Sequence, residues 1–352
     1  MTSDPSAPAD ARLAQLKLWL QTQAATFGFA LESLRPASAD ASFRRYFRLD
    51  CEGKAQRSLI VMDAPPPQEA TAPFVKVARL LLDAGLHAPQ VLAHDEAAGF
   101  VLLTDLGQTT YLTALLDTQR TEDHATAHDL MVDAIEALVR WQAASRPDVL
   151  PPYDAALLRR ELDLFPDWYL ARHLQHTPTE AQRAMLERTF DLIIQANLAQ
   201  GAVYVHRDYM PRNLMRSTPN PGILDFQDAV YGPIAYDVAS LLRDAFISWD
   251  EARTLDWSIR YWERARAANL PVPADFGQFW RNVEWMGLQR HLKVLGIFAR
   301  IRYRDGKPHY LTDAPRFIGY VRAVTRRYDE LAPLARFFDE LEGIPQHSAV
   351  TF

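Results

Sequence analysis

The chain has 352 residues, of which 48% are hydrophobic and 23% charged, and it carries a formal net charge of −6 at pH 7. That length is enough for two domains, and the acidic balance argues against broad electrostatic binding to nucleic acid or to anionic membranes. The single cysteine, Cys51, excludes an internal disulfide, which suits a reducing cytoplasm. No stretch approaches the roughly 20 apolar residues of a membrane span, so we expect a cytoplasmic protein without nucleic-acid or membrane partners.

The N-terminal part predicts a small lobe that mixes strands with helices. Residues 1–11 are rich in small residues and proline and indicate a flexible tail. Apolar periodicity predicts helices over residues 12–26 and 72–84, and short apolar runs predict strands over residues 31–36, 45–49, 58–62, 91–94 and 100–104. We therefore expect an α+β domain over residues 12–106.

The remainder of the chain predicts a larger and mainly helical lobe over residues 107–345. Helical periodicity covers residues 129–143, 157–173, 180–198, 234–246, 254–268 and 276–297. A short β-rich segment, residues 204–224, interrupts these helices. A cleft between two such lobes would be a natural ligand site.

Chemistry concentrates in that β-rich segment and directly after it. The run from His206 to Asn213 reads H-R-D-Y-M-P-R-N, and Asp225 follows the apolar pair Ile223-Leu224. Transfer of a phosphoryl group from ATP needs a carboxylate that accepts or orients the hydroxyl proton, and oxygen ligands for Mg²⁺. A turn at residues 217–222 would bring Asp225 back beside the loop. We expect Asp208 to be the catalytic base, and Asn213 and Asp225 to bind the metal.

These residues resemble the catalytic and metal loops of the protein-kinase-like fold, whose pattern is H-R-D-x-x-x-x-N followed by D-F. The segment from Asp225 to Asp237 resembles the aminoglycoside phosphotransferase branch, which includes choline and homoserine kinases. The resemblance implies a bilobal α+β fold with ATP and Mg²⁺ as cofactors. It also implies structural support from a buried His206 and from Asp237, bonded to the backbone of the catalytic loop.

The expected nucleotide lobe departs from that pattern. Residues 37–45 contain no glycine and residues 59–63 contain no lysine, although protein kinases use both to hold phosphates. The local replacements are Ser42, Phe43, Arg44, Arg45 and Arg48. On a strand Arg44 and Arg48 share one face and Arg45 takes the other. Glu69 would pair with one of these arginines, and the backbone of Thr104, Asp105 and Leu106 would contact adenine as a hinge.

The substrate is indicated by a closer resemblance. The segments SFRRYFR, IVMDAPPP, LLTDLG and ILDFQDAVYGPIAYD are similar to bacterial kinases that phosphorylate the anomeric hydroxyl of N-acetylmuramate and N-acetylglucosamine in peptidoglycan recycling. Those kinases also lack the lysine. A sugar with a carboxylate needs cations, amide donors and an aromatic wall. The candidates at helical spacing are Arg243, Trp285, Gln289, Arg290 and His291.

Other functions remain open from the sequence. The first alternative is another small-molecule kinase that acts on choline, homoserine or an aminoglycoside. The second is a nucleotide-binding scaffold without turnover, which the missing lysine and glycines favour and which the intact Asp208, Asn213 and Asp225 oppose. Each reading expects a small-molecule partner, and none predicts an oligomeric state.

Overall fold

The computed structural model describes residues 10–38, 43–51, 57–66 and 68–344. The chain divides into two compact units. The first contains Met1–Thr109 and Met215–Asp228, and the second contains Thr110–Leu214 and Ala229–Phe352. The first unit is therefore assembled from two separate stretches of the chain.

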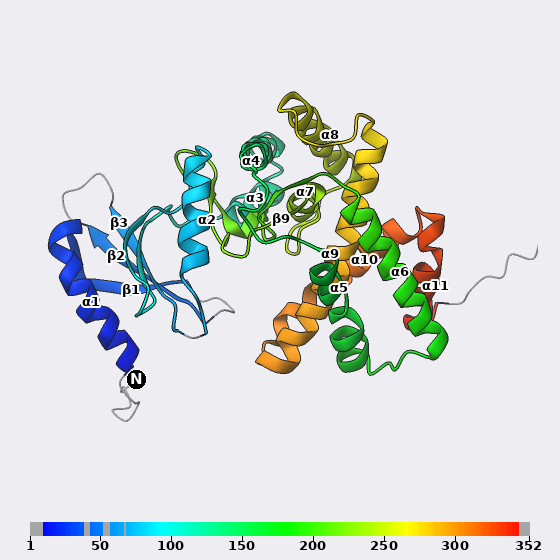
Figure 1. Ribbon diagram of the computed structural model, residues 1–352, viewed down its shortest axis with the longest axis horizontal. Coiled ribbons are helices and arrows are strands. Elements are labelled where there is room, and N and C mark those ends of the chain that lie inside the picture. The colour runs from blue at the N-terminus through cyan, green and yellow to red at the C-terminus, as the bar shows by residue number, and fades with distance from the viewer. Residues whose placement is uncertain (1–9, 39–42, 52–56, 67, 345–352) are drawn as a thin grey trace, which may run out of the picture. The chain divides into compact units, whose positions relative to one another are not determined.

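The first unit is built on an antiparallel five-stranded sheet in the order β1-β2-β3-β5-β4. Its strands are β1 (Phe29–Ser38), β2 (Arg45–Cys51), β3 (Ser58–Asp63), β4 (Val91–Asp95) and β5 (Phe100–Thr104). Helices α1 (Ala11–Phe27) and α2 (Ala72–Asp83) lie on opposite faces of this sheet (Figure 1). All five strands and both helices agree with the sequence prediction, with ends that differ by a few residues.

The two faces of the sheet differ because side chains alternate along each strand. One face packs on α1 through Leu16 and Leu20, which join a buried cluster with Leu49, Val61 and Leu102. The opposite face receives the intervening side chains. In the β2–β3 register the pair Tyr46–Met62 lies on this second face, and the adjacent pair Arg45–Asp63 lies on the α1 face.

The returning stretch Met215–Asp228 completes the first unit. Strands β7 (Leu214–Met215) and β8 (Gly222–Ile223) form a two-stranded sheet. The Ile223 N–H donates to the carbonyl of His87 at 2.8 Å, and the Phe226 ring packs on Phe74 of α2 with centroids 4.8 Å apart. A Cβ on Gly222 would lie 2.9 Å from Leu106 Cδ1, so this close approach requires glycine.

The second unit is mainly helical, and α9 (Phe276–Asp305) is its central element. This helix contacts η1, α5, α6, α7, α8, α10 and η3. The other helices are α3 (Tyr111–Thr121), α4 (His124–Ala143), α5 (Ala155–Leu162), η1 (Phe165–His173), α6 (Glu180–Leu198), α7 (Ala235–Leu242), α8 (Glu251–Ala267), α10 (Ala314–Thr325) and α11 (Ala332–Leu341). Short 3₁₀ turns are η2 (Pro211–Asn213), η3 (Pro308–Asp313) and η4 (Asp329–Leu331), and β6 (Ala202–Val205) pairs with β9 (Val230–Pro233).

The structure corrects three predicted helices. The helix predicted over residues 157–173 is two elements, because after α5 the chain continues from Phe165 as a π-helix with Pro166 in its first turn. Proline has no N–H to continue the α-helical ladder. The helix predicted over residues 234–246 ends at Leu242, and the last one extends to Asp305.

In the part of the chain that the structure describes, no helix combines the length and the apolar character needed to cross a bilayer.

Candidate active site

The predicted catalytic loop follows β6 in the second unit and is held by Asp237 of α7. The buried carboxylate of Asp237 accepts the backbone N–H of His206 at 2.7 Å and that of Arg207 at 3.0 Å. Burial raises the pKa of Asp237 to about 7, against the lowering effect of these two bonds. Arg207 has a φ of 75°, a left-handed conformation that costs energy in a non-glycine residue and is typically kept at functional sites.

Within the loop, Asp208 and Asn213 are joined through a backbone carbonyl. The Asn213 side-chain amide donates from Nδ2 to the carbonyl of Asp208 at 2.9 Å, and the Met210 N–H donates to the same oxygen at 2.9 Å. The Asp208 N–H donates to Nδ1 of the buried His206 at 3.3 Å. These contacts fix the loop through its backbone and orient the Asn213 amide.

A buried ion cluster centred on Glu161 of α5 lies behind this loop. Glu161 pairs with Arg207 and with Lys293 of α9, the latter at 2.8 Å, and it also accepts hydrogen bonds from Tyr153 and Gln289. Burial alone would raise the pKa of Glu161, but the charges of Lys293 and Arg207 lower it to about 2. The cluster therefore remains ionised and fixes the Arg207 side chain next to Asp208.

The predicted metal loop belongs to the first unit. Asp225 has a φ of 61°, and its Oδ1 accepts a hydrogen bond from Gln227 Nε2 at 2.9 Å. The next residue, Phe226, is buried against Phe74 and anchors the loop to α2. Asp208 and Asn213 are thus brought together in one unit, and Asp225 is fixed independently in the other.

The predicted pairing of Glu69 with an arginine of the nucleotide lobe is confirmed. Arg44, directly before β2, bonds Glu69 at 2.8 Å, and their side chains are 11% and 17% exposed. Arg44 is two residues from Tyr46 on the strand, and Tyr46 lies opposite Met62. The ion pair therefore belongs to the face of the sheet that α1 does not cover.

The other predicted phosphate contacts have different surroundings. Arg45 is on the α1 face, where it pairs with Asp10 and the buried Asp63, so its position is that of a packing residue. Phe43 is 70% exposed, and Ser42 lies outside the described residues. Arg48 forms a two-bond pair with Asp105, at 2.6 and 3.1 Å, at the end of β5.

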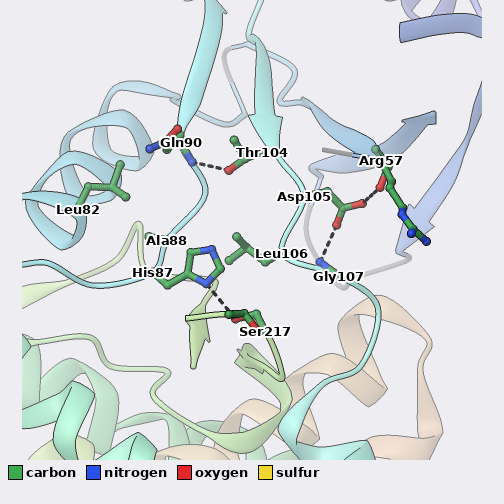
Figure 2. A pocket seen from close by; sticks show the side chains of 12 residues that line it. Arg57, Leu82, His87, Ala88, Gln90, Thr104, Asp105, Leu106, Gly107 and Ser217 are labelled. Atoms are coloured by element: carbon green, nitrogen blue, oxygen red, sulfur yellow. Dashed lines mark hydrogen bonds between the residues drawn. The ribbon is translucent and has the colours of Figure 1, made fainter. Parts of the chain in front are cut away.

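The predicted hinge borders a cavity of about 520 Å³ inside the first unit (Figure 2). The Thr104 hydroxyl accepts the Gln90 N–H at 2.9 Å, and the Asp105 carboxylate accepts the Gly107 N–H and the Ser58 hydroxyl. The wall of the cavity is formed by Arg57, Ser58, Leu82, His87, Ala88, Gln90, Thr104, Asp105, Leu106, Gly107, Ser217 and Thr218. All three predicted hinge residues therefore line one space.

The five predicted sugar-binding residues separate into two sets. Trp285 packs between Arg281, whose Cζ lies 4.4 Å from the ring centroid, and Tyr328, and Gln289 belongs to the Glu161 cluster. The second set is Arg243 at the end of α7 with Arg290 and His291 of α9. The pKa of the buried His291 lies well below the ordinary value. Burial is the main cause, and the positive charges of Arg290 and Arg243 lower the pKa further.

Several residues at these sites have no signal in the sequence. Glu161 and Lys293 are each far from the catalytic loop in the sequence, and ordinary helical periodicity explains both positions. Trp280 and Tyr320, which flank Arg243, are equally inconspicuous. Tertiary packing alone brings these side chains together.

Comparisons with known proteins identify the family to which the chain belongs. The sequence model of the phosphotransferase enzyme family (APH) matches residues 33–274. An N-acetylmuramate/N-acetylglucosamine kinase of Pseudomonas putida is 51% identical over an alignment of 341 residues that covers 95% of this chain and 98% of that protein. A protein of the same name from Neisseria meningitidis is 52% identical over 333 residues, covering 94% of this chain and 96% of the relative.

A solved structure from Mesorhizobium loti, a choline/ethanolamine kinase family protein, aligns with a TM-score of 0.60 at 14% sequence identity. The alignment covers 92% of this chain and 99% of that one. This likeness confirms the predicted protein-kinase-like fold class.

Proposed function

Because the chain belongs to the phosphotransferase enzyme family, we propose that it is a kinase that transfers the γ-phosphoryl group of ATP to the anomeric hydroxyl of N-acetylmuramate and N-acetylglucosamine. The observation that carries the proposal is identity of 51% and 52% to two kinases of that name over nearly the whole of both chains. The reaction would take place in the cytoplasm and return cell-wall sugars to use.

Asp208 is the proposed catalytic base. Its carboxylate would accept the proton of the anomeric hydroxyl while the sugar oxygen attacks the γ-phosphorus and the bond to the ADP oxygen breaks. Two features support this role. The backbone contacts to Asn213 and His206 hold the loop, so they do not require the Asp208 carboxylate. The two hydrogen bonds that Asp237 accepts from His206 and Arg207 hold the loop to α7.

Asn213 and Asp225 are the proposed magnesium ligands. Both side chains provide hard oxygen donors, which Mg²⁺ prefers, and each is oriented by a hydrogen bond, one to the Asp208 carbonyl and one from Gln227. In the described residues no group of three or more His, Cys, Asp or Glu side chains is arranged to hold a metal. A site with one carboxylate and one amide fits Mg²⁺ bound together with ATP phosphates, whose charge the ion would neutralise.

For the nucleotide we propose that Arg44, held by Glu69, takes the role of the missing strand lysine. In kinases that lysine is oriented by a glutamate. The partly buried Arg44–Glu69 pair provides the same combination of a cation and an orienting carboxylate. The backbone of residues 104–106 is the proposed adenine contact, which the cavity along this segment supports.

Replacing Arg44 with methionine is expected to raise KM for ATP about tenfold or more, because one charge-assisted contact to phosphate is lost. Glu69→Gln is expected to produce a smaller change in the same direction, since it only loosens the orientation of Arg44. Arg35→Met is the matched control, because Arg35 forms an exposed pair with Asp50. Steady-state kinetics with varied ATP provide the measurement, and an unchanged KM in Arg44→Met would remove Arg44 from the site.

The proposed function is tested by a coupled assay of ADP release with a panel of acceptors. We expect Mg²⁺-dependent turnover with N-acetylmuramate and N-acetylglucosamine, and an acid-labile, alkali-stable sugar phosphate as product. The panel includes choline, homoserine and an aminoglycoside. Turnover with one of those and not with the sugars would identify a different small-molecule kinase, and nucleotide binding without turnover on any acceptor would indicate a scaffold.

A further inference from the structure

Arg243 and Arg290 in the second unit both lie near the buried His291, whose pKa burial and their charges lower. The Arg243 guanidinium lies against two aromatic rings, with its Cζ 5.4 Å from the centroid of Tyr320 and 5.9 Å from that of Trp280. The His291 ring lies 4.9 Å from the Tyr320 ring. Arg290, the neighbour of His291 on α9, completes the group. Elements α7, α9 and α10 therefore converge on one patch that combines cations with flat aromatic surfaces.

Arg290 is the unusual member of this group. It is 3% exposed, and its Nη1 is buried without a hydrogen-bond partner in the described part of the chain. Its Nη2 lies 3.9 Å from the sulfur of Met210, two residues beyond Asp208. A buried guanidinium without a bonded anion is costly, because its desolvation is not compensated. The position next to the catalytic loop makes a bound anionic substrate the natural compensation.

Nearby acids do not provide a bonded partner for either arginine. Asp237 and Asp244 influence Arg290 through space, but Asp237 accepts the two loop N–H groups and Asp244 accepts the Phe246 N–H. Burial raises the pKa of both carboxyls, which disfavours their charged forms. Near Arg243, Glu251 and Glu284 each bond Arg327. Among the described residues no carboxylate within 4.0 Å pairs with Arg243 or Arg290.

We propose that Arg243 and Arg290 together bind the lactyl carboxylate of N-acetylmuramate and so determine how the enzyme discriminates between its two sugars. The inference rests on the proposed function. N-acetylglucosamine is the same ring without the lactyl group, so it lacks the anion that these arginines would bind. Tyr320 and Trp280 fix the Arg243 guanidinium, and they offer flat surfaces to the sugar. The Arg290 position beside Met210 keeps the carboxylate contact close to the loop where the anomeric hydroxyl reacts.

The test compares the two sugars in each variant. In Arg243→Gln we expect kcat/KM for N-acetylmuramate to fall about 10- to 100-fold, the range for loss of a charge-assisted hydrogen bond. For N-acetylglucosamine we expect a change of less than about threefold, since no contact is lost. Arg290→Gln should shift the ratio in the same direction. In the wild type, the methyl ester of N-acetylmuramate should lose the advantage of the acid, and in Arg243→Gln the difference between acid and ester should be smaller than in the wild type.

Arg281→Gln is the matched control, because Arg281 lies on the same helix and contacts Trp285, Tyr328 and Glu330. It should leave the ratio of the two sugars unchanged. An equal loss for both sugars in Arg243→Gln and Arg290→Gln, in protein that unfolds at the wild-type temperature, would overturn the inference and assign the arginines to structure. If the wild type phosphorylates neither sugar, the proposed function itself fails, and the inference fails with it.

Discussion

Substitution of Asp208 by asparagine is expected to lower kcat about 10³-fold, within the range of 10²–10⁴ for loss of a general base. The change removes the proton acceptor but keeps the size of the side chain. The loop should persist, because its bonds at this position use the backbone N–H and carbonyl of Asp208. Affinity for ATP should therefore remain within about threefold of the wild type, since the base acts on the acceptor sugar.

Single-turnover and steady-state kinetics measure the loss, and calorimetry measures ATP binding. Asp191→Asn is a control with the same chemical change, because its carboxylate is 64% exposed and lies 4.0 Å from Arg159. A variant that retains near-normal kcat with N-acetylmuramate would show that another group accepts the proton. A parallel loss of nucleotide affinity would mean that Asp208 shapes the nucleotide site instead.

Substitution of Asp225 by alanine is expected to lower kcat/KM about 10²–10³-fold, as for removal of a group that stabilises developing charge on the transferred phosphoryl. Its distinguishing effect should be on metal dependence. Wild-type affinity for ATP should be higher with Mg²⁺ than with EDTA, and Asp225→Ala should reduce this difference to near zero. Phe226 remains in place against Phe74, so the loop keeps its anchor.

Calorimetric titration of ATP with and without Mg²⁺ is the direct measurement. Asp83→Ala provides a control in the same unit, because the Asp83 side chain is 63% exposed at the end of α2. If Asp225→Ala binds Mg·ATP as tightly as the wild type, Asp225 is not a magnesium ligand. Gln227→Ala should show an intermediate loss, because Gln227 only orients the carboxylate.

The fold was predictable where the local pattern is strong. The short apolar run within residues 58–62 and the helical spacing from Glu180 to Leu198 each specify one element, and the structure has β3 and α6 at these places. The prediction was wrong where tertiary contacts decide. At Gly296 the absence of a side chain admits the backbone of Leu164, and the chain there changes from α5 to a π-helix, which no periodicity within residues 157–173 reveals.

For the candidate site, the local sequence specifies the order and spacing of Asp208, Asn213 and Asp225, whose roles stay predictions. The expected arginine–glutamate pair is present as Arg44 and Glu69. The surroundings of Gln289 and Trp285 were not predictable, because helical spacing shows which residues share a face but not what that face meets. Gln289 bonds Glu161, which lies 128 positions away, so the partner depends on the packing of α5 on α9.

The divided first unit also has a consequence for how the protein is made. Ile223 bonds His87 and Phe226 packs on Phe74. The sheet and α2 therefore lack these contacts until the ribosome has added a segment that follows more than a hundred residues after Thr109. A nascent chain that stops near Thr109 would leave Phe74 uncovered. We therefore expect the stretch up to Thr109 to remain accessible to chaperones and proteases during synthesis, until residue 228 has emerged.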